Sequence, residues 1–176
     1  MANTAPNKID QVLPEVWQQH VYYEFAMKDA KAALTTMSAN PYVLMVPLGI
    51  GARGREEVYK FYNEKFLRQL PADITPVPIS QAVGKDILVE EAVYRFTHDQ
   101  VMDWLIPGLA PTGKYVQIGL VAIIKFENDK IASEHIYWDH ASLLTQLGVI
   151  DQNKVSVKGV ESPRTLLEWA GIEDSV

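Results

Sequence analysis

A long apolar hairpin that ends on a carboxylate restricts the fold of this chain more than any other part of its sequence. Residues 117–126 and 131–139 have the length and apolar content of two strands, and the Asn-Asp pair between them is typical of a tight turn. The second strand ends at Asp139, and residues 141–147 then predict a short helix. We therefore expect two antiparallel strands whose last side chain meets the start of a helix.

The segments before this hairpin have helical and strand patterns. The apolar spacing predicts three helices, over residues 16–27, 30–37 and 55–70, and two strands, over residues 42–46 and 87–98. Pro76 and Pro78 mark an edge segment, because proline cannot donate a hydrogen bond within a sheet. Residues 101–106 either continue the preceding strand or form a flap. This order indicates an α+β fold with a curved antiparallel sheet wrapped around three N-terminal helices, a cone-shaped α+β barrel with an internal pocket.

The chain divides into a polar arm, one domain and a tail. Residues 1–12 have the composition of a flexible arm, and residues 13–150 are long enough to form one domain with its own core. Residues 151–176 form a C-terminal extension, in which Ser162-Pro163 is typical of a helix start. We expect this short helix to pack on the domain or on a second subunit.

The composition excludes several classes of function. The net charge is -6 and no run of Lys or Arg is present, so we expect no nucleic-acid partner. No apolar run reaches the roughly 20 residues that span a bilayer, so we expect no membrane partner. The chain has no cysteine, which rules out disulfides, thiolate metal sites and cysteine nucleophiles and fits a cytoplasmic location.

The end of the hairpin carries the first candidate catalytic residues. Strand alternation places Asp139, Tyr137 and His135 on one face. A carboxylate, a phenol and an imidazole that converge can move protons near a carbonyl group, and a carboxylate among aromatic rings has a raised pKa that suits this chemistry. The alternative is that Asp139 only caps the following helix. The spacing alone favours neither interpretation.

A second candidate lies on the preceding strand. His98 shares a strand face with Tyr94, and we expect this face to line the pocket. The alternative is a histidine that only hydrogen-bonds acidic neighbours at the end of its strand. We expect His20 and His140 at the surface or behind the site.

Signals for metals and cofactors are weak. The sequence has no metal-ligand spacing motif and no Gly-x-Ser-x-Gly, so we expect no metal and no serine nucleophile. We interpret the glycine-rich loop over residues 49–54 as an ordinary turn and expect no dinucleotide. A small-molecule substrate without a cofactor remains the expected ligand.

Residues 16–148 resemble the SnoaL-like polyketide cyclase branch of the nuclear-transport-factor-2-like superfamily. The motifs that carry the resemblance are Phe25 to Asp29, Pro111-Thr112-Gly113-Lys114, Asn128-Asp129-Lys130-Ile131, and Tyr137-Trp138-Asp139 followed by Leu143-Leu144-x-Gln146-Leu147-Gly148. The resemblance implies a homodimer formed through the sheet, a deep pocket, and acid/base chemistry without a metal or cofactor. Residues 44–47 depart from the family, because they are apolar where it often carries a polar residue.

The resemblance also assigns roles to residues. Asp139 occupies the family's acid/base position, where it would remove a proton alpha to a carbonyl, and His98 would assist. The predicted catalytic residues are therefore Asp139, His98 and His135, and the predicted substrate-binding residues are Tyr137, Tyr94, Trp104, Met45 and Phe25. We expect an aldol-type cyclase or an isomerase on an apolar carbonyl compound. A dehydratase, a hydrolase or a non-catalytic ligand-binding dimer are the alternatives on the same fold.

Overall fold

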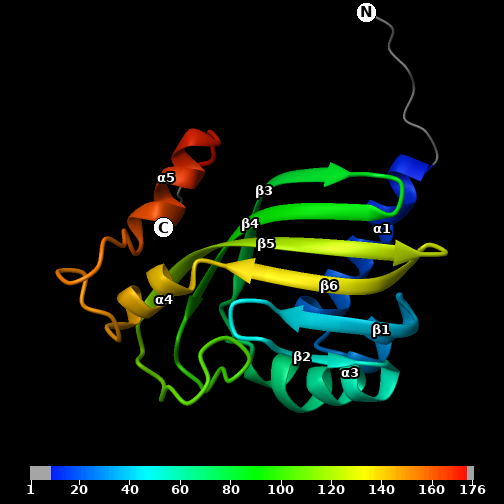
Figure 1. The fold of residues 1–176 in the computed structure, drawn as a ribbon, viewed down its shortest axis with the longest axis horizontal. Helices are drawn as coiled ribbons and strands as arrows, with labels where there is room; N and C mark the ends of the chain where they lie inside the picture. The colour runs from blue at the N-terminus through cyan, green and yellow to red at the C-terminus, as the bar shows by residue number, and fades with distance from the viewer. Residues whose placement is uncertain (1–8, 174–176) are drawn as a thin grey trace, which may run out of the picture.

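One curved sheet of six strands has helices on one of its faces (Figure 1). The computed structural model describes residues 9–173, so residues 1–8 of the predicted arm lie outside the described residues, while residues 9–12 belong to the first helix. In spatial order the strands are β2 (Ile50–Arg53), β1 (Met37–Met45), β6 (Lys130–Trp138), β5 (Tyr115–Glu127), β4 (Ile87–Thr97) and β3 (Thr75–Val83). Neighbouring strands are antiparallel except β1 and β6, which are parallel. The predicted α+β class is confirmed, with a sheet that stays open and contains one parallel pair.

The helices that cover the inner face are short, and two of them pass into π-helical turns. The segments in chain order are α1 (Ile9–Val21), the π-helical turn η1 (Tyr22–Ala26), α2 (Ala30–Thr35), α3 (Arg55–Phe61), the π-helical turn η2 (Tyr62–Phe66) and the 3-10 turn η3 (Leu67–Gln69). Asp29 caps α2 by accepting hydrogen bonds from the N–H groups of Lys31 and Ala32. The three predicted helices are present, and α2 ends earlier than predicted because the chain enters β1 at Met37.

The predicted hairpin is confirmed as β5 and β6. Asn128 and Asp129 form its turn with left-handed backbone φ angles of 51° and 58°. α4 (His140–Leu147) follows β6 directly, as predicted from its sequence. The register of the hairpin shifts near its turn, because Lys125 is paired with Ser133 whereas the next residue of β5 is paired with Ile131. This bulge changes the alternation of side chains at the start of β6.

Two segments that were not predicted as strands join the edges of the sheet. Pro76 and Pro78 lie in β3, which is an edge strand as their prolines indicate. The glycines of residues 49–54 have the spacing Gly-x-Gly-x-x-Gly, which can bind a dinucleotide between a strand and a helix of a parallel unit. Here they belong to the antiparallel β1–β2 hairpin, and a side chain at Gly51 would clash with the Val43 carbonyl oxygen. The glycine spacing therefore serves the close pairing of the edge strand β2 with β1.

The loop after β4 folds inward as a series of turns. Residues 101–106 neither continue the strand nor form a regular flap, and Met102, Leu105 and Ile106 are buried in the core. Trp104 of the same loop packs its ring at a right angle to Phe66, with 4.9 Å between ring centroids. This loop closes one end of the space between the sheet and the helices.

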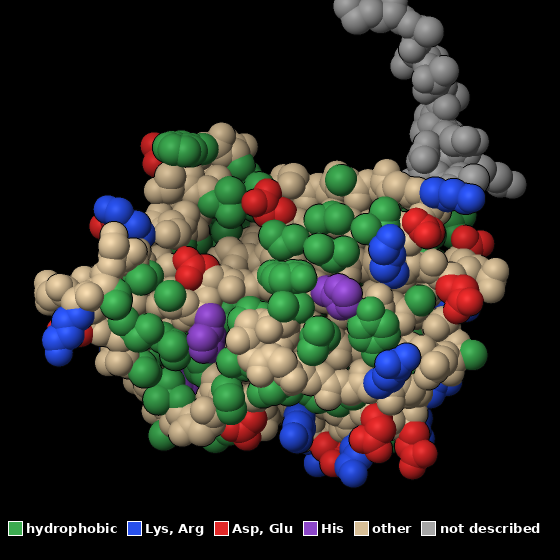
Figure 2. Space-filling view, viewed as in Figure 1, with side chains coloured by type: hydrophobic (Ala, Val, Ile, Leu, Met, Phe, Trp, Pro, Cys, Tyr) green, Lys and Arg blue, Asp and Glu red, His purple; other side chains and the backbone are tan. Residues whose placement is uncertain are grey.

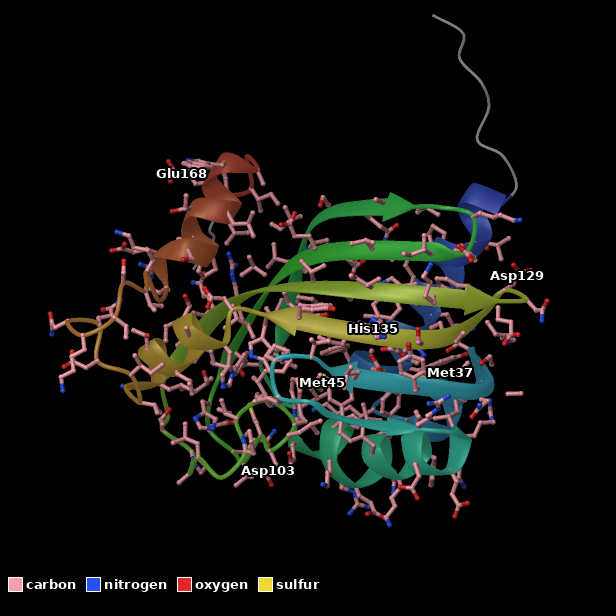
Figure 3. The ribbon with its side chains drawn as sticks, in the orientation of Figure 1. Met37, Met45, Asp103, Asp129, His135 and Glu168 are labelled. Atoms are coloured by element: carbon pink, nitrogen blue, oxygen red, sulfur yellow. The ribbon has the colours of Figure 1, made fainter. Side chains whose placement is uncertain are left out.

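The outer face of the sheet is only partly covered. α5 (Glu161–Trp169) packs on β5, with Leu167 fully buried and Leu166 close to Gly119. Figure 2 looks onto the outer face and shows hydrophobic side chains gathered over the central strands, around His135 on β6, which Figure 3 labels. In the part of the chain that the structure describes, every helix is too short or too polar to cross a bilayer.

Candidate active site

A mostly apolar cavity lies between the inner face of the sheet and the helices. It has a volume of about 590 Å³ including the open space at its mouth. Aromatic and aliphatic side chains form most of its wall, in which Glu24 and Glu134 are the two carboxylates. A cavity with these walls suits an apolar ligand.

Glu134 reaches the cavity from the middle of β6. Ile136 and Trp138 follow it on the same face of the strand, and all three side chains are buried. Ile136 also lines the cavity, whereas the residues between them face outward or are half-buried. A single acidic residue is thus held among apolar neighbours on the inner face of the sheet.

Glu24 and Tyr62 reach the same point from the helical layer, and both lie in π-helical turns. In η1, which contains Glu24, the N–H of Met27 donates to the carbonyl of Tyr22, five residues earlier, at 3.1 Å. Tyr62 is the first residue of η2, and its carbonyl accepts from the N–H of Leu67. π-helical turns are rare and are frequent at functional sites, because they re-aim the side chains that they carry.

His20 on α1 joins these groups into one cluster. It is fully buried, and its Nε2 lies 3.2 Å from Glu24 Oε1, 3.2 Å from Glu134 Oε1 and 3.2 Å from the Tyr62 hydroxyl oxygen. The Tyr62 hydroxyl donates to Glu134 Oε1 at 3.0 Å. We call His20, Glu24, Tyr62 and Glu134 the His20 cluster. Of the two positions expected for His20, the surface is wrong because the ring is fully buried, and the position behind the site describes it, because its partners line the cavity and His20 does not.

The hydrogen bonds of His20 define its protonation. Its Nδ1 lies 3.2 Å from the Ala33 carbonyl oxygen, which can only accept, so Nδ1 carries a proton. Its Nε2 lies 3.2 Å from an oxygen of each of two carboxyl groups, and the phenol of the cluster donates to Glu134, so a charged ring donates here as well. Burial alone lowers the pKa of His20, but the charges of Glu24 and Glu134 and the hydrogen bonds with them outweigh it and raise this pKa to about 10.

The two carboxyl groups of the cluster have different surroundings. Burial raises the pKa of Glu24, although the positive charge of His20 opposes this shift. Glu134 accepts hydrogen bonds from both Tyr62 and His20, which suits a carboxylate. Burial also raises the pKa of Tyr62, and that of Tyr94 in the cavity wall, so both phenols keep their protons. The cluster therefore combines one carboxyl group whose pKa is raised by burial with a second that accepts two hydrogen bonds.

Three members of the cluster also have a spacing that could hold a metal ion. One potential ligand atom from each of His20, Glu24 and Glu134 lies within 4.8 Å of the other two. Among the described residues this is the one group of at least three histidine or acidic side chains with this spacing. The sequence prediction found no metal-ligand motif because these residues come from distant segments. The raised pKa of His20 favours a protonated ring, which would place a positive charge between the same two carboxyl groups.

Asp139 caps α4 and does not line the cavity. Its Oδ1 accepts from the Ser142 N–H at 2.9 Å and its Oδ2 from the Ser142 hydroxyl at 2.6 Å, and the residue is exposed. The prediction that Asp139 lies in the pocket is wrong, and the alternative of a helix cap describes its position.

His135 and Tyr137 lie on the outer face of the sheet. The Tyr42 hydroxyl is 2.8 Å from His135 Nε2, and Tyr137 is 40% exposed. Strand alternation correctly grouped the two residues, but their face is the one that points away from the helices. The predicted convergence of Asp139, Tyr137 and His135 on the pocket is therefore wrong.

His98 is buried behind the wall of the cavity. Its Nδ1 accepts a hydrogen bond from the Thr112 N–H at 3.3 Å, and burial lowers its pKa. It does not line the cavity, although Tyr94 and Phe96 on the preceding strand do. The structure therefore does not bring His98 together with the other predicted catalytic residues.

Four of the five predicted substrate-binding residues line the cavity, namely Phe25, Met45, Tyr94 and Trp104, and only Tyr137 does not. Contact of these residues with a substrate remains a prediction.

The motif Leu-Leu-x-Gln-Leu-Gly attaches α4 to the sheet. The Gln146 side chain accepts from the Gln117 N–H at 3.0 Å and donates to the Gln117 carbonyl at 2.8 Å, so it pairs with β5 as a strand would. Gly148 ends α4 in a left-handed conformation with φ 83°. Together with the cap at Asp139, this motif fixes both ends of the helix, and its side chains form no part of the cavity wall.

An open α+β cone with an internal cavity is the fold of ketosteroid-isomerase-like and NTF2-like proteins. A protein from Jannaschia sp. CCS1 assigned as a SnoaL-like polyketide cyclase superposes with a TM-score of 0.68 and 14% identity, over 85% of this chain and 100% of that chain. A protein with a ketosteroid isomerase-like fold from Catenulispora acidiphila, in complex with trimethylamine, has a TM-score of 0.60 and 17% identity, over 78% of this chain and 95% of that chain. At these identities the likeness shows the fold.

The chain belongs to the SnoaL-like polyketide cyclase family, because the family model matches residues 18–147. A similar structure from Acidithiobacillus ferrooxidans is also assigned as a polyketide cyclase. It superposes with a TM-score of 0.63 and 16% identity, over 84% of this chain and 98% of that chain. No match was found among curated proteins.

Proposed function

We propose that this chain is a cofactor-independent acid/base enzyme that acts on an apolar carbonyl compound, with the His20 cluster as its proton-transfer site. The supporting observation is a buried group of one imidazole, one phenol and two carboxyl groups against an apolar cavity. Buried charges are costly to keep in a fold unless they are paired, and groups with shifted pKa values gather at functional sites. The family supports a cyclase-type or isomerase-type fold, and the particular reaction is our proposal.

The cavity-facing members of the cluster take the two roles that such chemistry needs. Glu134 acts as the base that removes a proton from the carbon next to the carbonyl, and the carboxyl group of Glu24 gives a proton to the carbonyl oxygen. His20 does not line the cavity, so it acts behind the two carboxyl groups by balancing their charge. In this proposal Glu134 is the catalytic base, the role that the sequence resemblance gave to Asp139.

The enol or enolate formed in this step leads to two outcomes. In an isomerase, the proton on Glu134 returns to a different carbon of the same molecule. In an aldol-type cyclase, the nucleophilic carbon attacks a second carbonyl of the substrate and a carbon–carbon bond forms. The new alkoxide takes up the proton held by Glu134, and the first carbonyl is restored as its oxygen returns its proton to Glu24. Dehydratase or hydrolase chemistry on this fold needs a positioned hydroxyl group or water, which a mostly apolar cavity favours less.

The test uses 2-tetralone, a flat bicyclic ketone, as a probe. The wild-type chain in D2O should accelerate exchange of the protons next to the carbonyl, followed by proton NMR. Glu134→Gln should slow this exchange by about 10²- to 10⁴-fold, as expected for the loss of a general base. Asp139→Asn is the matched control, because it changes a carboxylate outside the cavity, and its exchange rate should equal that of the wild type.

Two results would decide against the enzyme. If folded Glu134→Gln exchanges 2-tetralone as fast as the wild type, Glu134 is not the base. If the wild type binds 2-tetralone, seen as a change in tryptophan fluorescence, but does not accelerate exchange, the chain is better described as a small-molecule-binding domain. The mostly apolar wall of the cavity is the observation that supports this second function, the binding of a small molecule without catalysis.

We also propose that the chain forms a homodimer through the outer face of its sheet. Exposed and half-buried apolar side chains lie there around His135, and α5 covers only one end of this face (Figure 2). Sedimentation equilibrium should give a dimeric mass for the wild type and a lower mass for Tyr137→Lys, which places a charge on this face. A monomeric mass for the wild type would contradict the dimer.

A further inference from the structure

We propose that Thr36 is a positioning residue, which holds His20 so that Nε2 is the nitrogen that serves the two carboxyl groups. This inference deepens the proposed function and matters for catalysis only if the His20 cluster transfers protons. Its effect on His20 can nevertheless be measured without any substrate.

The geometry at Thr36 leaves its oxygen as an acceptor. Thr36 directly follows α2 and is 2% exposed. Its hydroxyl donates to the Ala33 carbonyl oxygen at 2.7 Å, so the hydroxyl proton is already used. His20 Nδ1 lies 2.6 Å from Thr36 Oγ1, and the only proton available for this short contact is the one on Nδ1. Thr36 and Ala33 thus hold the Nδ1 proton between two oxygens.

This arrangement fixes the chemistry of the ring. A neutral imidazole carries its proton on one nitrogen, and the partner of that nitrogen decides which one it is. Because Nδ1 keeps its proton, any proton that His20 gives or takes passes through Nε2. The ring therefore needs neither a flip nor a change of tautomer between its charged and neutral forms.

The groups that face His20 separate into two sides. Glu24 from η1, Tyr62 from η2 and Glu134 from β6 face Nε2, and they are its titratable neighbours. From α2 and its end the ring meets only the uncharged oxygens of Ala33 and Thr36. The indole of Trp17 stacks on the ring with 5.8 Å between centroids. Among residues 9–173, Thr36 is therefore the one side chain that hydrogen-bonds the imidazole on the side away from the carboxyl groups.

A change of the Thr36 side chain should leave the main chain in place. The Thr36 carbonyl accepts from the Ile131 N–H at 3.0 Å, and this backbone bond joins the end of α2 to β6. Valine has nearly the shape of threonine without the hydroxyl, and serine keeps the hydroxyl without the methyl group. Thr36→Val and Thr36→Ser are therefore a matched pair for separating the hydrogen bond from packing.

The experiment follows the two ring nitrogens of His20 by long-range proton–nitrogen NMR, in the full chain with ¹⁵N-labelled histidine, between pH 6 and 11. The chain has four histidines, and the His20 signals are identified by their loss in His20→Gln. We expect the apparent pKa of His20 to fall by about one to two pH units in Thr36→Val, since a hydrogen bond to a charged group is lost. Thr36→Ser should titrate like the wild type.

Three results would overturn the inference. These are an unchanged His20 titration in Thr36→Val, an equal fall in Thr36→Val and Thr36→Ser, and a neutral wild-type ring with its proton on Nε2. If Thr36→Val does not fold, Thr36→Ala takes its place with the same expectation. Since no turnover is measured, a failure here would leave the role of Glu134 untouched, and a failure of the 2-tetralone exchange would leave this titration intact.

Discussion

The protonated state of His20 should make the stability of this protein fall as the pH rises from about 7.5 to 9. In the unfolded chain histidine has a pKa near 6.5, so His20 would be almost neutral throughout this range. In the folded chain the pKa of His20 is raised to about 10, so the ring stays protonated. The folded state therefore binds about one proton more than the unfolded state.

The size and the sign of the effect follow from this difference. Stability changes with pH in proportion to the protons bound in the unfolded state minus those bound in the folded state, at about 1.4 kcal/mol per proton and pH unit. Here the difference is about minus one, so the free energy of unfolding should fall by about 1.4 kcal/mol per pH unit. The contribution is fully present below pH 6.5 and is lost as the pH passes through about 10. The raised pKa of Glu24 acts in the same direction, so it can only make the fall steeper.

The assay is urea unfolding at a series of pH values, followed by the fluorescence of the four tryptophans. The upper limit of about pH 9 avoids the titration of unfolded tyrosines and lysines. His20→Gln should lose the slope, whatever its overall stability. His135→Gln is the matched control, because it removes a histidine from the outer face, and it should keep the slope.

A wild-type stability that stays level between pH 7.5 and 9 would refute the imidazolium, and with it the proton count of the cluster. The same slope in His20→Gln as in the wild type would assign the proton to another group. Either result would also remove the charge that balances the two carboxyl groups in the proposed mechanism.

Three further outcomes test the parts of the structure around the site. Asp139→Ala should lower the free energy of unfolding by about 0.5–2 kcal/mol through loss of the α4 cap, whereas Asp139→Asn should cost only a few tenths, both by urea unfolding. Gln146→Leu should cost about 1–3 kcal/mol, because it leaves the N–H and carbonyl of Gln117 without their partner, and an unchanged midpoint would contradict this pairing. Ala122→Leu adds bulk to the cavity wall and should abolish binding of 2-tetralone at a cost of about 1–3 kcal/mol in stability, so intact binding by the folded variant would place the ligand elsewhere.

The secondary structure was largely readable from the sequence because its signals are local. The β5–β6 hairpin and α4 follow from apolar alternation, a turn pair and a terminal glycine, all within one short segment. The edge strand β2 was missed because it is only four residues long and lies within the glycine-containing segment 49–54, although Ile50 and Ala52 alternate with exposed positions. Such a strand exists only because β1 lies beside it, and this pairing is a tertiary contact.

The site was not readable in the same way, for two physical reasons. Alternation along β6 groups the residues of each face, but it does not say which face meets the helices, so the prediction directed Tyr137 and His135 to the pocket, whereas the opposite face, which carries Glu134, lines it. His20 and Glu24 are one helical turn apart, a spacing that is as common on exposed helices as in buried sites. Only contact with Tyr62 and Glu134 makes them a cluster, and these residues lie far away in the sequence. The His-x-x-x-Glu pair on the helix face that carries Trp17 was the one local signal.

The two π-helical turns have a consequence for how this scaffold gains or loses chemistry. Each turn holds one residue more than the α-helical turn that it replaces, so each amounts to a single-residue insertion that leaves the rest of the helix in phase. Glu24 and Tyr62 both depend on such a turn, while the sheet and most of the core do not. Deleting one residue in η1 or η2 would rotate a single polar group away from the cavity and keep the cone. Insertions and deletions of this size could switch the proton chemistry of such a cone on or off without rebuilding its fold.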